Sequence, residues 1–133
     1  MADAPVELLR GVPLFADLKD REVRAIAGAM TQRKVEAGQS LAVEGTQGIG
    51  FFVIESGIAK VTVEGEERRT LGPGDYFGEI ALIVDTPRTA TVTADTPLVA
   101  WAIASWAFRP IVQENAKVAW RLLDSLAHML AQR

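Results

Sequence analysis

Nine of the eleven glycines in this 133-residue chain lie between Gly38 and Gly78. The stretches between them are short and rich in β-branched and aromatic residues, which is the pattern of strands joined by tight turns. The clearest strands are expected at 51–54, 58–63, 89–93 and 98–103, and the turns at 36–38, 55–57, 64–65 and 72–75. Short strands at this spacing predict a compact antiparallel barrel or roll.

Upstream of this glycine-rich section, the pattern changes to that of a helix. Four apolar residues follow the i, i+3, i+4, i+7 spacing of an amphipathic helix: Val23, Ile26, Ala27 and Met30. The spacing predicts a helix over 20–30, and Asp17 is expected to cap its N-terminus. A shorter helical turn is expected at 6–9.

Downstream of the glycine-rich section, helical patterns return. A short helix is expected over 105–114, with Pro110 in its first turns or at a bend. Asn115 is expected to cap a longer helix that runs to the end of the chain. Five residues are predicted to form its apolar face: Ala119, Leu122, Leu123, Leu126 and Leu130. Helices therefore flank a small β-roll on both sides.

Composition removes several classes of function. The formal charge of −3 and the pI near 5.2 give no basic face for nucleic acid, so DNA or RNA binding is not expected. The chain has no cysteine, which excludes disulfides and thiol chemistry. Its longest apolar stretch, 98–104, is far shorter than the roughly twenty residues that cross a bilayer. We expect a soluble cytoplasmic protein with one core.

An acid and a base stand at fixed spacing inside otherwise apolar sequence, at Glu79 and Arg88. The surrounding run is Phe77-Gly78-Glu79-Ile80-Ala81-Leu82, followed after five residues by Arg88-Thr89-Ala90-Thr91-Val92. A lone buried charge costs on the order of several kcal/mol. A small ligand that carries both an anion and hydroxyl groups would satisfy the pair.

This run resembles the phosphate-binding cassette of cyclic nucleotide-binding domains, the module of catabolite-activator-type regulators, cyclic-nucleotide-dependent kinases and cyclic-nucleotide-gated channels. Residues 52–57, 71–75 and 12–15 are similar to other segments of the family, so the resemblance covers nearly the whole chain. It implies a mainly β fold with flanking helices, a double-stranded β-helix or jelly-roll-like β-roll. A single domain over 1–133 is expected, with N-terminal helices to residue 30, the roll over 31–104 and two C-terminal helices.

The resemblance implies a phosphate site around Arg88. A guanidinium offers a planar fork of donors that suits two phosphate oxygens, which a lysine does not match. If one helical turn follows Gly78, the N–H groups of Ile80 and Ala81 point at the same phosphate. Gly78 lets the backbone approach the ligand closely, and Glu79 is placed to accept a hydrogen bond from the ribose 2′-hydroxyl.

The resemblance also implies the contacts of the base. In the family, a hydroxyl at the position of Thr89 touches the phosphate and the amino group of a guanine, yet family members with that hydroxyl bind either nucleotide. Val61 and Leu71 match positions whose apolar side chains line the purine side of the pocket. Phe77 and Ala90 complete the expected ligand-binding set. We expect cAMP in preference to cGMP.

Two features depart from the family pattern or stay open. Residues 48–50 read Gly-Ile-Gly where the family often carries an acidic residue, which is expected to loosen that loop. Near the end of the chain, where the family's last helix supplies a residue that covers the base, three residues are candidate caps: His128, Met129 and Arg133.

Simpler structural interpretations compete with these roles. Glu79 and Arg88 are also explained as a structural ion pair. The run 64–69 is most simply a solvated hairpin tip. Three tryptophans are expected in the core or at helix contacts rather than as a platform for stacking bases: Trp101, Trp106 and Trp120.

Enzymatic alternatives lack the residues that they need. A cupin-type metal site takes several histidines, and a hydrolase needs a histidine base, whereas the chain has one histidine in a predicted helix. The stronger rival is a ligand-free protein-interaction module of the same fold. Because Glu79 and Arg88 are both present, binding is favoured.

The sequence therefore predicts a regulatory sensor and not an enzyme. Its ligand is cAMP or cGMP, and no metal, nucleic acid or membrane contact is expected. Binding is predicted to pull the turn after Gly78 inward, and the apolar residues Ile80 and Leu82 would pass that shift to the helix over 115–133. That helix is expected to act as a lid, or to dock in a homodimer or on an effector domain.

Overall fold

A computed structural model describes residues 3–46, 50–82 and 87–131 of the chain. The helical elements are α1 (Val6–Arg10), the short 3-10 helix η1 (Pro13–Phe15), α2 (Asp20–Ala29), the 3-10 turn η2 (Glu79–Leu82), α3 (Ser105–Gln113) and α4 (Ala116–Ala131). The strands are β1 (Thr31–Val35), β2 (Ser40–Ala42), β3 (Gly50–Ser56), β4 (Ala59–Val63), β5 (Glu66–Leu71), β6 (Tyr76–Phe77), β7 (Thr91–Ala94) and β8 (Leu98–Ala104).

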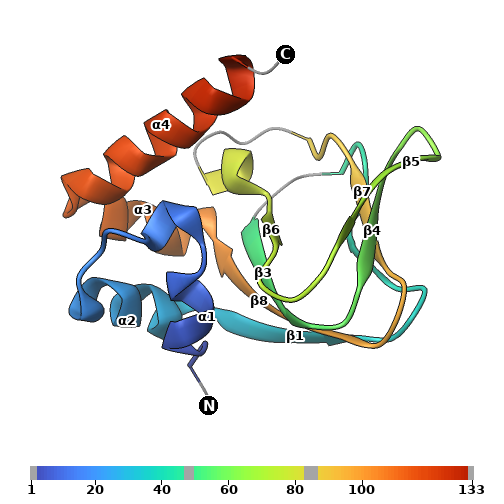
Figure 1. The fold of residues 1–133 in the computed structure, drawn as a ribbon, viewed down its shortest axis with the longest axis horizontal. Helices are drawn as coiled ribbons and strands as arrows, with labels where there is room; N and C mark the ends of the chain where they lie inside the picture. Colours follow the sequence, from blue (N-terminus) through green and yellow to red (C-terminus); the bar gives the residue numbers. More distant parts are fainter. Residues whose placement is uncertain (1–2, 47–49, 83–86, 132–133) are drawn as a thin grey trace.

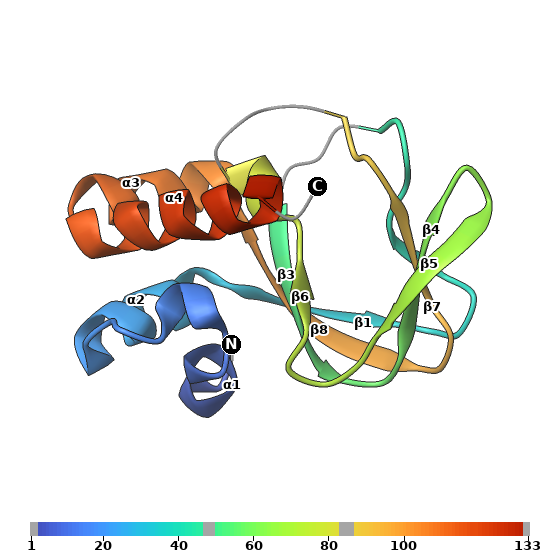
Figure 2. The same ribbon diagram turned by 45° about the horizontal axis from the view of Figure 1, so that its top comes forward.

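The strands in the described part of the chain form two four-stranded antiparallel sheets. The first sheet has the order β1-β8-β3-β6, and the second has the order β2-β7-β4-β5. The sheets make a roll at one end of the molecule, and the helices gather at the other end (Figure 1). Figure 2 shows α1 and α2 on one side of that helical end and α3 and α4 on the other. The predicted fold class, mainly β with flanking helices, is confirmed.

Four of the strands agree with the predicted ones to within two residues at each end: β3, β4, β7 and β8. The prediction of a solvated hairpin tip over 64–69 is correct in exposure, since all six residues are exposed in the β4–β5 hairpin, but the tip itself is shorter than predicted. Only Glu64 and Gly65 form the turn, and β5 begins at Glu66. Because β5 is an edge strand whose first five residues are exposed, it carries no alternation of polar and apolar residues to reveal it.

One turn of the roll depends strictly on glycine. Gly57 has a φ of +92°, and a Cβ there would stand 2.4 Å from the carbonyl oxygen of Pro97 and 2.8 Å from the Cα of Leu98. The turn between β3 and β4 therefore packs against the chain that enters β8 with no room for a side chain.

Two hydrophobic clusters lie on the two faces of β3. The helical-side cluster consists of Ala4, Leu9, Val12, Leu14, Phe15, Leu18, Val23, Ile26, Ala27, Met30, Phe51, Val53, Leu82, Trp101, Ile103, Phe108, Val118 and Leu122. The roll-interior cluster consists of Leu41, Ala42, Phe52, Ile54, Ala59, Val61, Leu71, Phe77, Val92, Ala94, Leu98 and Ala100. Since side chains alternate along a strand, Phe51 and Val53 join the first cluster, and Phe52 and Ile54 join the second.

Helix α2 begins at Asp20, but Asp17 does not cap it. The carboxylate of Glu22 accepts a hydrogen bond from the Lys19 N–H at 2.8 Å, which closes the first turn. A carboxylate oxygen of Asp17 lies 3.4 Å from Nη1 of Arg121 instead. The predicted cap is therefore wrong, because the helix starts three residues after Asp17 and that side chain pairs with α4.

Polar contacts tie the start of α4 to the N-terminal segment. The side-chain amide of Asn115 donates to the carboxylate of Glu22, and Nη2 of Arg121 donates to the carbonyl of Pro13 at 3.0 Å. The side-chain oxygen of Asn115 accepts from the Lys117 N–H at 3.1 Å. Asn115 therefore caps α4, as predicted.

The predicted apolar face of α4 is only partly correct. Of its five residues only Leu122 is buried, and Leu123 and Leu130 are 59% and 65% exposed. The helix packs against α3 and η1 with Val118 and Leu122. Its exposed apolar residues form an outward stripe of α4, which consists of Trp120, Leu123 and Leu130. No helix in the described ranges, α4 included, is long and apolar enough to span a bilayer.

The tryptophans divide between core and surface. Trp101 is buried in β8 and donates its indole N–H to the carboxylate of Glu55 at 2.7 Å. Trp106 and Trp120 are 66% and 70% exposed, so the expectation that they dock helices is wrong. Their helices use other faces, through Phe108 in α3 and Val118 in α4.

Candidate functional site

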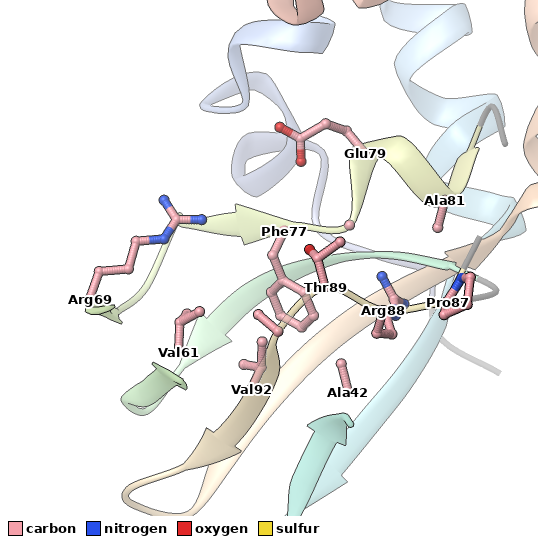
Figure 3. A pocket seen from close by; sticks show the side chains of 12 residues that line it. Ala42, Val61, Arg69, Phe77, Glu79, Ala81, Pro87, Arg88, Thr89 and Val92 are labelled. Carbon is pink, nitrogen blue, oxygen red and sulfur yellow. The ribbon is translucent and has the colours of Figure 1, made fainter. Parts of the chain in front are cut away.

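A pocket of about 190 Å³ opens between the second sheet and the turn η2 (Figure 3). Twelve residues line it: Ala42, Val61, Arg69, Phe77, Gly78, Glu79, Ala81, Pro87, Arg88, Thr89, Ala90 and Val92. Strands β2, β7, β4 and β5 contribute the floor, while β6, η2 and the segment 87–90 form the other wall. Most of the pocket is therefore built from the run that the sequence singled out.

The floor of the pocket is one row of side chains that crosses all four strands of the second sheet. Ala42 pairs with Val92, and Val92 pairs with Val61. Val61 in turn pairs with Arg69 on the edge strand β5. Because paired residues of neighbouring strands stand side by side on one face, the four side chains form a continuous row, with Ala42 and Arg69 at its ends (Figure 3).

Gly78 allows the chain that enters η2 to lie directly against Gly50 of β3 and the guanidinium of Arg88. Its φ is +92°, and a Cβ there would lie 2.6 Å from the carbonyl oxygen of Gly50 and 2.7 Å from Nη1 of Arg88. Both contacts are too short for real atoms, so any side chain at this position would push Arg88 aside. Glycine is thus required by the backbone angle and by the space that the guanidinium fills.

Arg88 is half-buried at one end of the pocket. Its Nη2 donates to the carbonyl of Gly50 at 2.7 Å, and its guanidinium carbon lies 5.8 Å from the centre of the Phe52 ring. The Phe52 ring stacks on Phe77 at 4.9 Å. Backbone bonds also fix the segment, since the Arg88 N–H donates to the carbonyl of Thr46 at 2.7 Å. The side chain is therefore placed before any ligand arrives.

The charge of Arg88 is not neutralised within the described part of the chain. No carboxylate there lies within 4 Å of the guanidinium, and burial lowers the pKa of Arg88 because it disfavours the charged form. Arginine stays protonated at neutral pH all the same. The pocket thus offers a fixed positive charge, and guanidinium N–H groups other than the one bound to Gly50 can donate to a ligand.

Glu79 turns away from Arg88. In Figure 3 its carboxylate points to the far side of β6, and the two side chains form no ion pair. The structural ion pair that competes with a binding role is therefore absent. The carboxylate lies close enough to Tyr76 to contribute, after burial, to a raised pKa of that phenol.

The backbone amides of η2 differ from the expectation. The Ala81 N–H donates to the carbonyl of Gly78 at 3.0 Å, which is the i to i−3 bond of a 3-10 turn. The prediction that this amide is free for an anion is wrong for the structure described. The corresponding role of the Ile80 amide stays a prediction.

Eight of the ten residues predicted for the site line the pocket: Val61, Phe77, Gly78, Glu79, Ala81, Arg88, Thr89 and Ala90. Leu71 does not line the pocket. It follows the lining residue Arg69 by two positions along β5 and is buried in the roll-interior cluster opposite Ala59. The side chain of Ile80 lies outside what the structure describes.

Four lining residues were not among the predicted site residues: Ala42, Arg69, Pro87 and Val92. Val92 follows Ala90 by two residues, so strand alternation was a usable signal for it. Ala42 and Arg69 reach the pocket only through the pairing of β2 and β5 with their neighbours. The local sequence of β2 or β5 does not predict which residues of the neighbouring strands they pair with.

His128, the one candidate cap whose side chain the structure describes, does not line the pocket. His128 is exposed on α4, with Nδ1 2.8 Å from the carbonyl oxygen of Asp124. The side chain of Met129 and the whole of Arg133 lie outside the described residues. Across the described ranges, no three His, Cys, Asp or Glu side chains stand together as metal ligands.

Comparison with known proteins bears on what the pocket holds. The family model described as "Cyclic nucleotide-binding domain" matches residues 32–115. The chain is 48% identical over 92 residues to a cAMP-dependent protein kinase regulatory subunit of Yarrowia lipolytica, covering 68% of this chain and 24% of that protein. It is 36% identical over 124 residues to a cGMP-dependent protein kinase of Eimeria tenella, covering 93% of this chain and 11% of that protein.

A solved structure of a related regulatory domain has a similar fold. The co-crystal structure of the regulatory domain of Toxoplasma gondii PKA with cAMP superimposes with a TM-score of 0.74 at 34% identity, over 82% of this chain and 43% of that one. The chain spans a quarter or less of the length of the two curated relatives above.

Proposed function

The chain belongs to the cyclic nucleotide-binding domain family, and from this premise we propose that the pocket holds a 3′,5′-cyclic nucleotide through Arg88 and the turn that follows Gly78. One observation carries the proposal. The guanidinium of Arg88 is half-buried, is fixed on the carbonyl of Gly50, and has no carboxylate within 4 Å among the described residues. An anionic ligand recovers the free energy that such a buried cation costs.

The phosphate is assigned to the end of the pocket where Arg88, Gly78 and Thr89 meet. The free edge of the guanidinium donates to phosphate oxygens, and the Thr89 hydroxyl lies on the same wall. The Ala81 N–H joins them only if η2 exchanges its bond to Gly78 for one to the ligand. Phosphate binding and a change in η2 are then the same event.

The ribose is assigned to Glu79. Its carboxylate is an acceptor that no ion pair within the described residues occupies. To reach a ribose in the pocket, the side chain would turn from the far side of β6, where Figure 3 shows it. It would accept a hydrogen bond from the 2′-hydroxyl. Charge-assisted bonds of about 1.5–3 kcal/mol each, added to burial of a purine, give an affinity of roughly micromolar order.

The purine is assigned to the apolar part of the floor, over Val92 and Val61, with Phe77 beside it. We propose cAMP as the ligand, because the Yarrowia lipolytica relative and the Toxoplasma gondii structure are named for it. The Eimeria tenella relative is named for cGMP, so both nucleotides belong in the first binding experiment.

The signal is assigned to a path from η2 to α3 and α4. The turn contacts both β3 and α3, and its Leu82 belongs, with Phe108 of α3, to the helical-side cluster. A shift of η2 toward bound phosphate therefore moves a member of that cluster. We propose that residues 1–133 act as one non-catalytic regulatory unit, and that the outward stripe of α4 is where an effector or a second copy responds.

Titration calorimetry with cAMP and cGMP tests the proposal on the wild type and on Arg88→Ala. We expect micromolar binding to the wild type and a loss of at least a hundredfold in the variant, since two charge-assisted bonds of about 1.5 kcal/mol or more disappear. Arg24→Ala is a control for the loss of one positive charge, because Arg24 is exposed on α2 and does not line the pocket.

The opposite result is equally clear. If neither nucleotide gives heat with folded wild-type protein, the site is not a nucleotide site, and the ligand-free interaction module takes its place. Near-ultraviolet circular dichroism on the same sample shows that the buried Trp101 is ordered and that the protein is folded.

A further inference from the structure

Glu44 does not line the pocket, but it belongs to the turn that holds the backbone of Arg88. This turn covers residues 43–46, directly after β2. The Gly45 N–H donates to the carbonyl of Arg88 at 2.9 Å, and the Arg88 N–H donates to the carbonyl of Thr46 at 2.7 Å. Both backbone polar groups of Arg88 are therefore bonded to the turn over 43–46.

Glu44 bonds this turn to two other parts of the second sheet. Its N–H donates to the hydroxyl of Thr91 in β7 at 2.9 Å. One of its carboxylate oxygens accepts from the N–H of Glu64 at 2.9 Å. Glu64 lies in the turn between β4 and β5, and these two strands carry half of the row of side chains that forms the pocket floor. Glu44 therefore connects the turn that holds Arg88 to the hairpin that carries the floor.

The N–H that Glu44 accepts from belongs to a strained residue. Val63 pairs with Glu66, so the chain reverses over two residues, and both have a positive φ: +54° for Glu64 and +79° for Gly65. Positive φ at both positions is the requirement of a type I′ turn, whose first position favours asparagine, aspartate or glycine. A glutamate is strained there, and such strain persists only where surrounding contacts hold it. The hydrogen bond to Glu44 is one of these contacts.

The carboxylate of Glu44 acts as a hydrogen-bond acceptor and not as a partner in an ion pair. Glu44 is half-buried, and within the described ranges no cationic side chain pairs with it. Because the backbone of Arg88 is bonded to the same turn, a movement of that turn moves the base of the Arg88 side chain. A group that binds a ligand must be held to within about 0.5 Å by the residues that support it.

We propose that Glu44 is a positioning residue for the phosphate end of the pocket: it accepts the hydrogen bond of the Glu64 N–H, fixes the turn over 43–46, and so places Arg88 for the anion. The inference rests on the proposed function, because it requires that Arg88 binds the phosphate. Glutamine should replace Glu44, since its side-chain carbonyl is also an acceptor, whereas alanine should not.

Glu44→Gln and Glu44→Ala separate the hydrogen bond from the charge. In calorimetry we expect Glu44→Ala to bind cAMP about tenfold more weakly, and Glu44→Gln to stay within twofold of the wild type. Glu64→Asn is the matched control and should leave the affinity unchanged, because it removes a carboxylate from the hairpin turn, keeps the N–H and suits the positive φ. In the Arg88→Ala background, Glu44→Ala should weaken binding by less than twofold, because its effect passes through Arg88.

A measurement on the free protein tests the positioning without any ligand. In ¹⁵N-edited NMR spectra, the Nε–Hε resonance of Arg88 should shift or broaden in Glu44→Ala and keep its wild-type position in Glu44→Gln. A purely structural role of Glu44 in the hairpin would lower the stability of the protein without moving this resonance.

The opposite results would overturn the inference. It is wrong if both Glu44 variants change the affinity by the same factor, since the charge and not the hydrogen bond then affects binding. It is also wrong if the Arg88 resonance of Glu44→Ala matches that of the wild type, or if the tenfold loss persists in the Arg88→Ala background. Normal binding by the wild type with an unchanged affinity in Glu44→Ala overturns this inference alone. If the folded wild type binds neither cAMP nor cGMP, the proposed function fails and takes the inference with it.

Discussion

The two faces of β3 support hydrophobic clusters of different kinds. The helical-side cluster is closed: none of its described members lines the pocket, and Phe51 meets Phe15 and Tyr76 with ring centres 5.9 and 5.7 Å apart. The roll-interior cluster is open, since four of its members also line the pocket: Ala42, Val61, Phe77 and Val92. Substitutions on the first face should therefore act on stability, and substitutions on the second should act on binding.

The largest effect is expected from a truncation on the closed side. Phe51 is fully buried, so Phe51→Ala should lower the free energy of unfolding by about 3–5 kcal/mol in urea titrations. Val92→Ala removes about two methylene equivalents on the open side, and should cost roughly 1.5 kcal/mol. It should weaken nucleotide binding in addition. Equal losses of stability, or an unchanged affinity in Val92→Ala, would break the contrast between the two faces.

The next largest effect is expected at Gly78, which lies against Gly50 and Arg88. Gly78→Ala forces a Cβ against Gly50 and Arg88, so we expect about 1–3 kcal/mol less stability and at least tenfold weaker binding. Gly74→Ala is a matched control, because Gly74 has a φ of +88° with nothing within 4 Å of an added Cβ. The control should show the backbone strain without the loss of affinity. A similar loss of affinity in both variants would mean that the close approach to Arg88 is unimportant.

A smaller effect isolates the ribose contact. Glu79→Gln should weaken cAMP binding about tenfold, because a charge-assisted bond to the 2′-hydroxyl becomes a neutral one. With 2′-deoxy-cAMP the same substitution should change the affinity by less than twofold. This cycle measures the coupling between the carboxylate and the hydroxyl directly. Independent, additive losses in calorimetry would remove Glu79 from the ribose site.

The smallest effect is a dependence of stability on high pH. Burial, followed by the charge of Glu79, raises the pKa of Tyr76 above its ordinary value of 10.0. The unfolded chain therefore loses this proton first, so the stability is full below about pH 10 and falls as the pH rises through the folded pKa. Between about pH 9 and 11, the free energy of unfolding should fall more for the wild type than for Tyr76→Phe. Identical pH profiles for the two proteins would contradict this assignment.

The sequence specified the glycine-rich roll and the turn side of the pocket well, because these features are local. The run that contains Gly78, Glu79 and Arg88 encodes its own turn, and the structure brings these residues to one wall. The strands that were missed are short or exposed, so they carry no apolar alternation. Edge strand β5 is the clearest example, with five exposed residues before Leu71.

The floor of the pocket was harder to predict because it depends on pairing between distant strands. Arg69 joins the site only through its register opposite Val61 and through the bulge at Arg68. The cap of α2 failed for a similar reason, since Asp17 pairs with Arg121 of α4, more than a hundred residues later. Local periodicity does not contain such contacts.

The role of Arg88 can be observed directly through its own side chain. In ¹⁵N-edited NMR spectra of arginine-labelled protein, the Arg88 Nε–Hε resonance, assigned with Arg88→Lys, should shift on addition of cAMP and stay unchanged with adenosine, which lacks the phosphate. That result places the phosphate on the guanidinium that Gly50 holds in the free protein. A resonance that does not move when cAMP saturates the protein, or that moves equally with adenosine, would contradict it.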